Sequence, residues 1–202
     1  MYSNVRGVKG KKSSLTEILH ENNPHLFLLT ETQMRSNYGF SIKGYAYYGR
    51  NREGKIGVGI LVRSDIAARV KPHINDRGIE IMWISVYRKN CRPLLVGVYY
   101  GRQETRTSKI EIQHEMLLQE EITEMSNEGE ILLAMDGNAK IGLLGEDISR
   151  NGRLLLETFK QTGLVVMNGT EKCQGQVTRI KTKNGKEKSA IDFVLANEQM
   201  VK

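Results

Sequence analysis

Three carboxylate side chains occupy the same kind of position in this sequence, at or near the ends of short apolar runs. Glu31 follows "LFLLT", Asp136 follows "ILLAM", and Asp192 lies inside the last apolar run, "SAIDFVLA". A carboxylate at the end of a buried strand lies at the rim of a sheet, where several strand ends can converge. Converging carboxylates repel one another, and their oxygen atoms suit a hard divalent cation such as Mg²⁺. Three separate, solvated strand-end acids fit the pattern equally well, so the residues alone leave both interpretations open.

Polar side chains accompany these strand ends. Asn138 follows Asp136 by two residues in "MDGN", a Gly-containing turn that lets an acid and an amide point at the same small ligand. The carboxylate could accept a proton from water, and the amide could donate to a phosphate oxygen. "VGVYYG" ends another strand with Tyr99 and Tyr100, either of which could donate a phenol hydrogen bond to phosphate. Asp-Gly-Asn is also a common turn, and paired tyrosines also serve as packing residues.

The first half of the chain predicts one helix followed by strands. The helix is expected over residues 14–22, where Ser14 and Glu17 form a capping box and apolar residues recur at helical spacing. The continuous apolar run before Glu31 is typical of a strand buried on both faces. Four further strands are expected at residues 45–49, 56–63, 79–87 and 94–99.

The second half mixes helices with strands. A long amphipathic helix is expected over residues 108–125, and a helix that ends at Gly163 precedes the apolar strand "LVVMN". "QVTRIKTK" and "KEKSAIDFVLA" predict a hairpin, because the Asn184-Gly185 pair between them suits a type I′ turn. Strands joined both by hairpins and by helices indicate an α/β sandwich with the sheets inside. Four consecutive strands with no helix between them argue against a doubly wound parallel sheet.

Composition limits the class of protein. With 202 residues, 39% hydrophobic and 26% charged, the chain is expected to form one folded domain over residues 1–202. No apolar stretch has the length of a membrane span, and Cys91 and Cys173 are too few for a disulfide framework, so we expect a soluble protein of a reducing compartment. The net charge of +7 fits a polyanionic partner such as nucleic acid, and it equally fits ordinary solubility charge.

Six short motifs occur in an order that is typical of one superfamily. They are "SNVRGVKGK" with Asn4, "LFLLTET", "VGVGILV", "VGVYYG", "MDGN" and "SAIDFVLAN". With them the chain resembles the endonuclease/exonuclease/phosphatase superfamily of metal-dependent phosphoesterases, which includes deoxyribonuclease I and abasic-site endonucleases. The stretch "NGRLLLETFKQTGLVVMNGT" is similar to the endonuclease domain of non-LTR (long interspersed) retrotransposons. The resemblance covers nearly the whole chain and implies a deoxyribonuclease I-like, four-layer α/β/β/α sandwich with the site at one rim of its two sheets.

The resemblance implies a role for each matching position. Glu31 would be the principal ligand of Mg²⁺, with Mn²⁺ as the alternative, and Asp136 would orient or activate the attacking water. Asn4 and Asn138 would position the scissile phosphate. Tyr99 would stabilise charge on the phosphate oxygens, and it is preferred to Tyr100 because the tyrosine of the family directly follows an apolar strand residue.

Three further positions match residues that support the site in the family. Asp192 would orient a histidine, and Thr178 and Ser189 would support the site. The family pattern ends on a strand with Ser-Asp-His, a motif that this sequence does not contain. Its histidines lie before the late strands, at His20, His25, His73 and His114. We therefore expect a domain truncated at its C-terminus, with the last strand of the fold missing and the activity reduced.

The expected function is that of a Mg²⁺-dependent endonuclease that nicks DNA and leaves a 3′-hydroxyl to prime reverse transcription. The expected partners are DNA and a downstream reverse transcriptase domain, with no membrane partner, and the expected location is intracellular and nuclear. Two alternatives remain open. One is a phosphatase of the same fold that acts on a small phosphorylated substrate, and the other is a catalytically dead nucleic-acid-binding remnant.

Overall fold

The computed structural model describes residues 1–35, 39–50, 56–73, 77–103, 109–173, 178–181 and 187–201. The chain divides into two compact units, Met1–Tyr100 (unit 1) and Gly101–Lys202 (unit 2), and each unit is described by itself. Within the described ranges, none of the helices combines the length and the apolarity that a membrane span requires. The expectation of one domain over residues 1–202 stays a prediction.

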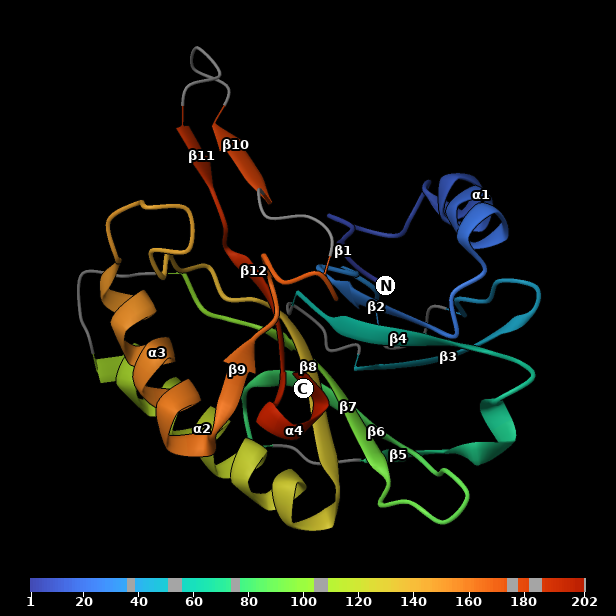
Figure 1. Cartoon of the computed structure of the whole chain (residues 1–202). Coiled ribbons are helices and arrows are strands. Elements are labelled where there is room, and N and C mark those ends of the chain that lie inside the picture. Colours follow the sequence, from blue (N-terminus) through green and yellow to red (C-terminus); the bar gives the residue numbers. More distant parts are fainter. Residues whose placement is uncertain are drawn as a thin grey trace. The chain divides into compact units, whose positions relative to one another are not determined.

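Unit 1 contains one α-helix and seven strands among its described residues (Figure 1). The first four strands form a sheet of order β1-β2-β4-β3, in which β1 and β2 are parallel and the other pairs antiparallel. The strands β5, β6 and β7 follow one another in antiparallel order. The elements are β1 (Tyr2–Asn4), α1 (Lys12–Asn22), β2 (Leu26–Thr30), β3 (Tyr45–Arg50), β4 (Val58–Arg63), the 3₁₀ turn η1 (Ala67–Arg69), β5 (Val70–His73), β6 (Glu80–Val86) and β7 (Leu94–Tyr100).

The five strands expected in this half of the chain are confirmed, and two more are present. The strand β1 is only three residues long, too short for an apolar pattern to reveal. The strand β5 contains Pro72, which the sequence pattern treats as an interruption. Proline is tolerated there because β5 is an edge strand. No described strand pairs with its outer side, so a missing N–H on that side removes no hydrogen bond between strands.

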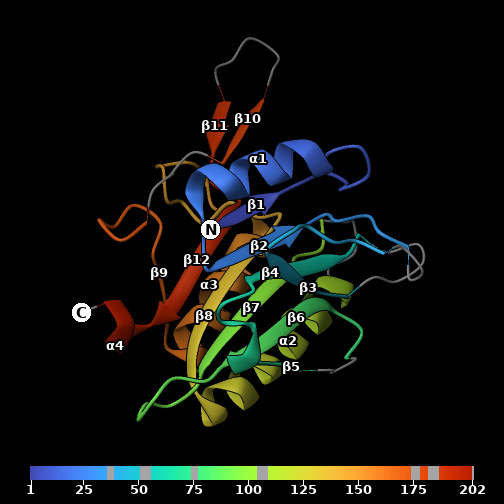
Figure 2. The ribbon, with the colours of Figure 1, turned by 90° about the vertical axis from the view of Figure 1, so that its right-hand side faces the viewer.

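One buried cluster of unit 1 lies between α1 and one face of the four-stranded sheet (Figures 1 and 2). Leu15 and Leu19 of the helix pack in one cluster with Phe27 and Leu29 of β2 and with Leu61 of β4. All five side chains are buried, and complete burial stabilises each by about 1.5–3 kcal/mol. This packing fixes the central strand β2, at the end of which Glu31 follows.

The beginning of α1 differs from the prediction. The helix begins at Lys12, and Leu15 N–H already bonds to the carbonyl of Lys11 at 2.9 Å, so Ser14 lies within the first turn and is not a capping residue. The ammonium of Lys11 donates to the carbonyl oxygens of Val5 and Arg6 at 2.6 and 3.2 Å. The start of the helix is therefore fixed by Lys11, whose side chain contacts the preceding loop, and the predicted Ser14–Glu17 capping box is wrong.

Unit 2 places two helices against its strands β8, β12 and β9, which pair in that order and are antiparallel. The helices α2 and α3 pack side by side, α2 against β8 and α3 against β9 (Figure 1). The side chain of Ser149 caps α3, and Gly163, with φ 66°, ends it as predicted. The elements are α2 (Lys109–Glu128), β8 (Glu130–Asp136), α3 (Arg150–Thr162), β9 (Leu164–Val166), β10 (Arg179–Lys181), β11 (Glu187–Ser189), β12 (Asp192–Asn197) and α4 (Glu198–Val201).

The predicted hairpin is present, but its second half is not one strand. The strands β10 and β11 pair antiparallel, and the predicted Asn184-Gly185 turn lies outside the described residues. The chain then breaks at residues 190–191 and continues as β12, which pairs with β8 instead of β10. The hydroxyl of Thr178 accepts hydrogen bonds from the N–H groups of Ile191 and Asp192 at the break. A side chain thus replaces the ladder partner there and lets the chain change partners.

Candidate active site

In unit 1 the ends of two parallel strands bring Asn4 and Glu31 together. Asn4 is opposite Thr30 in the register of β1 and β2, so Glu31 follows at the same edge of the sheet. Asn4 Nδ2 donates to Glu31 Oε1 at 2.8 Å, and Asn4 Oδ1 accepts from the N–H of Arg6 at 3.2 Å. The strand alignment and these two bonds orient both side chains.

The backbone of Glu31 is in the left-handed region, with φ 54°. This conformation costs a non-glycine residue about 1–2 kcal/mol, so the surrounding structure must hold it. The carbonyl of Glu31 accepts from the N–H of Gly7 at 2.7 Å, and the next residue, Thr32, donates to the carbonyl of Gly57 at 3.1 Å. A strained residue held in this way is a recurrent feature of functional sites.

The donor set of this pair fits a hard divalent cation. Asn4 occupies one carboxylate oxygen of Glu31, and no hydrogen bond from a described residue reaches the other, Oε2. Mg²⁺ in proteins is held by one or two carboxylates and keeps several of its waters. Within the described ranges, no three His, Cys, Asp or Glu side chains are close enough together to hold a metal ion. The pair therefore fits a magnesium site with a single carboxylate and is unlike a closed protein cage.

Tyr99 lies near the end of β7 in unit 1, opposite Ile81 of β6. Its side chain is completely buried, and that of the neighbouring Tyr100 is only 7% exposed. Exposure therefore does not separate the two tyrosines, and the preference for Tyr99 stays a prediction.

In unit 2 the turn after β8 holds Asp136 and Asn138 in a fixed geometry. The N–H of Asn138 donates to Asp136 Oδ1 at 3.0 Å, which makes a local Asx turn, and Asn138 has φ 47°. Asn138 Nδ2 donates to the carbonyl of Gly101 at 2.8 Å. A primary amide has two N–H groups, so one remains available for another acceptor such as a phosphate oxygen. The tight acid–amide turn predicted from "MDGN" is present.

Asp192 is directly opposite Asp136 in the register of β12 and β8, and the two residues are 8% and 2% exposed. Opposite residues of an antiparallel pair have Cα atoms only about 4.5–5.5 Å apart. Thr178 Oγ1 accepts from the N–H of Asp192 at 3.2 Å, and Thr178 N–H donates to the carbonyl of Ser189 at 3.2 Å. Thr178 and Ser189 thus fix the start of β12, and their role in supporting the site stays a prediction.

Sequence reasoning did not single out two buried asparagines of unit 2 that make specific bonds around these residues. Asn168 Nδ2 donates to the carbonyl of Asp192 at 3.1 Å, and Asn151 Nδ2 donates to the carbonyl of Arg102 at 3.1 Å. Both lie in the "NGRLLLETFKQTGLVVMNGT" stretch, but an asparagine beside a glycine is also an ordinary turn signal. The structure thus forms two groups, one in each unit: Asn4 and Glu31, and Asp136, Asn138, Asp192, Thr178 and Ser189.

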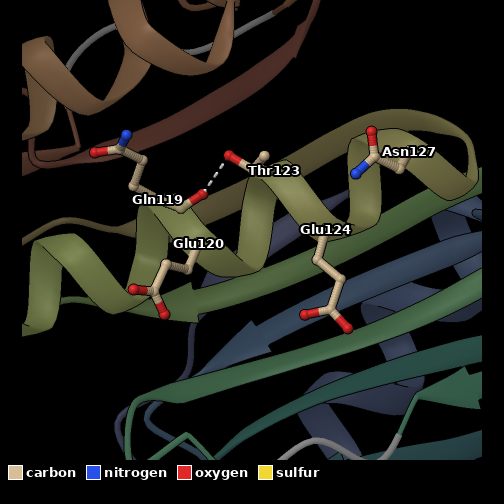
Figure 3. Close-up of a pocket in the computed structure, with 5 residues that line it drawn as sticks. All are labelled: Gln119, Glu120, Thr123, Glu124 and Asn127. Carbon is tan, nitrogen blue, oxygen red and sulfur yellow. Dashed lines mark hydrogen bonds between the residues drawn. The ribbon is translucent and has the colours of Figure 1, made fainter.

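A hollow along α2 is lined by Gln119, Glu120, Thr123, Glu124 and Asn127 (Figure 3). The Thr123 hydroxyl donates to the carbonyl of Gln119 at 2.8 Å, and the Glu120 and Glu124 side chains project from the same side of the helix. None of the predicted site residues is among the described residues that line this hollow. The candidate site is therefore described by its hydrogen bonds and strand register, not by a pocket.

The profile of the Endonuclease/Exonuclease/phosphatase family matches residues 1–131, which are more than half of the chain. The chain therefore belongs to this family, whose members are hydrolytic nucleases and phosphatases, and the sequence resemblance is confirmed. A comparison with curated proteins finds no match.

Solved structures of the same fold are similar over nearly the whole chain. The endonuclease domain of TRAS1, a telomere-specific non-LTR retrotransposon, has 17% identity and a TM-score of 0.73, and the alignment covers 99% of this chain and 85% of that one. The 3′-5′ exonuclease NExo from Neisseria meningitidis has 17% identity and a TM-score of 0.74, with 98% and 86% covered. The AP endonuclease LMAP from Leishmania major has 11% identity and a TM-score of 0.80, with 98% and 78% covered.

At these identities the likeness shows the fold alone. It confirms the predicted fold class, a mixed α/β fold of the deoxyribonuclease I type. One related structure is described as the 3′ phosphatase NExo from Neisseria bound to a product DNA hairpin, so DNA is a ligand of that protein.

Proposed function

We propose that this chain is a divalent-metal-dependent phosphodiesterase that nicks DNA and leaves a 3′-hydroxyl. The observation that carries the proposal is the 2.8 Å hydrogen bond from Asn4 to Glu31 at the ends of two parallel strands. It holds one carboxylate, with an oxygen available, beside an amide, in a chain of a family of nucleases and phosphatases.

In unit 1 the proposal assigns Glu31 as the residue that holds Mg²⁺ or Mn²⁺. When bound, the ion supplies Lewis-acid stabilisation of charge on the phosphate and on the leaving oxygen. Asn4 keeps the Glu31 carboxylate oriented through its bond to Oε1. Tyr99 supplies a phenol to a phosphate oxygen in this proposal.

In unit 2 the proposal assigns Asp136 as the acceptor of the proton of the attacking water. Asn138 donates its second amide N–H to a phosphate oxygen, while the first holds the side chain against the Gly101 carbonyl. Asp192 lies opposite Asp136 and helps to orient the reacting groups, and Thr178 and Ser189 fix the start of its strand. A neutral amide paired with a carboxylate base suits hydrolysis of a phosphodiester.

The biological role proposed here is that of a non-LTR retrotransposon endonuclease. The similarity to the TRAS1 domain and the "NGRLLLETFKQTGLVVMNGT" stretch support it. The 3′-hydroxyl would then prime reverse transcription by a polymerase domain, and the place of action would be the nucleus. The net charge of +7 supports a DNA partner, and binding through phosphates should weaken steeply with rising salt.

The test is nicking of supercoiled plasmid with Mg²⁺, with Mn²⁺ and with chelator, by the chain and by its Glu31→Gln variant. We expect nicks that need the divalent ion and Glu31, and that a DNA polymerase extends directly because each nick ends in a 3′-hydroxyl. Nicking by the Glu31→Gln variant at the same rate would overturn the assignment. As a matched control, Glu17→Gln on the exposed face of α1 should leave the rate unchanged.

A phosphatase of the same fold is the second candidate, and the related 3′ phosphatase favours it. An oligonucleotide with a 3′-phosphate distinguishes the two, because a phosphatase releases inorganic phosphate from it and does not nick the plasmid. If the folded protein binds DNA in a salt-sensitive way but has neither activity, the remaining interpretation is a catalytically dead nucleic-acid-binding remnant.

A further inference from the structure

We infer that Asn151 is a positioning residue that fixes the side chain of Asn138 by holding the backbone of residues 101–102. The inference deepens the proposed function and rests on it, because it assigns a purpose to the orientation of Asn138. All the contacts that carry it lie within unit 2.

The orientation of Asn138 depends on one carbonyl group. Its Nδ2 donates to the carbonyl of Gly101 at 2.8 Å, while its backbone N–H is bonded to Asp136 Oδ1. The N–H of Gly101 in turn donates to the carbonyl of Asp136 at 2.7 Å. The Asx turn therefore fixes the backbone of Asn138, and the Gly101 carbonyl fixes its side chain. A displacement of Gly101 would rotate the Asn138 amide while its backbone stayed in place.

The backbone at Gly101 lies too close to the Asn138 turn for any side chain. A Cβ atom at Gly101 would be only 2.6 Å from the carbonyl oxygen of Gly137. The two backbone segments are therefore in direct contact, and a small shift of one is transmitted to the other.

Asn151 holds the next residue of the same segment. Its side chain is 5% exposed, and its Nδ2 donates to the carbonyl of Arg102 at 3.1 Å. Gly101 is thus held between two bonds, its own N–H to Asp136 and the bond from Asn151 to the carbonyl of its neighbour.

The first turn of α3, which carries Asn151, is itself fixed to the Asn138 loop. Ser149 Oγ accepts from the N–H groups of Lys140 and Gly152, each at 3.1 Å, and Ser149 N–H donates to the carbonyl of Lys140 at 3.0 Å. A Cβ atom at Gly152 would be 1.9 Å from that carbonyl oxygen. Because these bonds attach the start of the helix to the loop, Asn151 holds residues 101–102 in a fixed position relative to the loop.

A merely structural role would give the same hydrogen bond without any effect on Asn138. The two roles differ in what an alanine substitution changes. A structural asparagine contributes only to stability, through the hydrogen bond that it makes. A positioning asparagine also changes the environment of the Asn138 amide and the rate of the reaction that uses it.

The experiment compares Asn151→Ala with Asn197→Ala. Asn197 ends β12, at the opposite end of the strand pair from Asp192, where its Oδ1 accepts from the N–H of Ile131. Both variants should lower the melting temperature. Only Asn151→Ala should shift the side-chain NH₂ resonances of Asn138 in a ¹⁵N–¹H spectrum, and only it should lower kcat for nicking, by about 10- to 100-fold with KM little changed.

A double substitution provides the second readout. If Asn151 acts through Asn138, adding Asn151→Ala to an Asn138→Ala variant should lower kcat by less than about 3-fold further. Unshifted Asn138 resonances, equal kcat values for the two single variants, or fully multiplicative effects would each overturn the inference. If the unmodified chain does not nick DNA while the resonances shift, the proposed function fails and the link from Asn151 to Asn138 stands.

Discussion

Asn4 and Glu31, 27 residues apart in sequence, are joined by a 2.8 Å hydrogen bond from Nδ2 to Oε1 at the ends of β1 and β2. The parallel register brings them to one edge of the sheet, and the left-handed backbone of Glu31 ends β2 at that point. The bond occupies Oε1 of the Glu31 carboxylate. It therefore fixes the orientation of the carboxylate and the direction in which Oε2 can bind a ligand.

Asn4→Ala should lower the affinity for Mg²⁺ more than it lowers the stability of the fold. Partners that orient a metal ligand typically contribute 10- to 100-fold in metal affinity or activity, so the Mg²⁺ concentration for half-maximal nicking should rise by about that factor. Asn22→Ala serves as the control, because among the described residues its amide bonds only to the carbonyl of Ile18 at the exposed end of α1. An unchanged Mg²⁺ dependence in Asn4→Ala would contradict the orienting role.

Asn138→Gly should separate the backbone role of Asn138 from its side-chain role. Glycine adopts φ 47° without strain, so the turn should form, while the amide that bonds to Gly101 is removed. We expect the nicking rate to fall by about 10²- to 10³-fold, the typical effect of removing one donor to a developing charge. Asn90→Gly, at an exposed residue with φ 57°, should leave the rate unchanged. An active Asn138→Gly variant would remove the amide from the mechanism.

Thr178→Val should destabilise the junction between β11 and β12. The threonine hydroxyl accepts from two backbone N–H groups, those of Ile191 and Asp192, and valine keeps the shape but removes the acceptor. Because water can reach this exposed residue and satisfy part of the loss, we expect the free energy of unfolding in urea to fall by about 1 kcal/mol. Thr178→Ser retains the hydroxyl and should recover most of that loss. Equal stability of the valine and serine variants would show that the hydroxyl is dispensable.

Much of the fold follows from local sequence patterns. The four residues Leu26–Leu29 are all apolar because β2 is buried on both faces, and this pattern predicts the strand. The pattern fails where a side-chain contact to a neighbouring loop decides. Ser14 has the residue type of a helix cap, but the ammonium of Lys11 reaches the preceding loop and the helix begins earlier.

The candidate site shows the same division. The Asp136–Asn138 turn is local and could be predicted from three consecutive residues. The bond from Asn151 to Arg102 joins residues 49 apart, and no spacing rule connects a helix start with a segment so distant in sequence. Tyr99 shows a third case, because only the family resemblance distinguishes it from its neighbour Tyr100, and both side chains are buried.

Glu115 should make the stability of the protein depend on pH. Burial against α3 raises the pKa of this carboxyl from 4.5 to about 7, and the 3.5 Å contact from the Thr158 hydroxyl opposes the shift. Between these two pH values the folded state keeps the proton that the unfolded state releases. The free energy of unfolding should therefore fall as pH rises from 4.5 to about 7 and stay level above that.

The size of this effect follows from about 1.4 kcal/mol per unit of pKa, which over the difference between 4.5 and about 7 gives a loss of about 3–4 kcal/mol. Glu115→Gln should remove the dependence and make the protein more stable at pH 8, as measured by urea unfolding at several pH values. Glu124→Gln, at an exposed position on the same helix, should retain the pH dependence of the unmodified chain. A Glu115→Gln variant whose stability still falls between pH 5 and 7 would show that another group carries the titration.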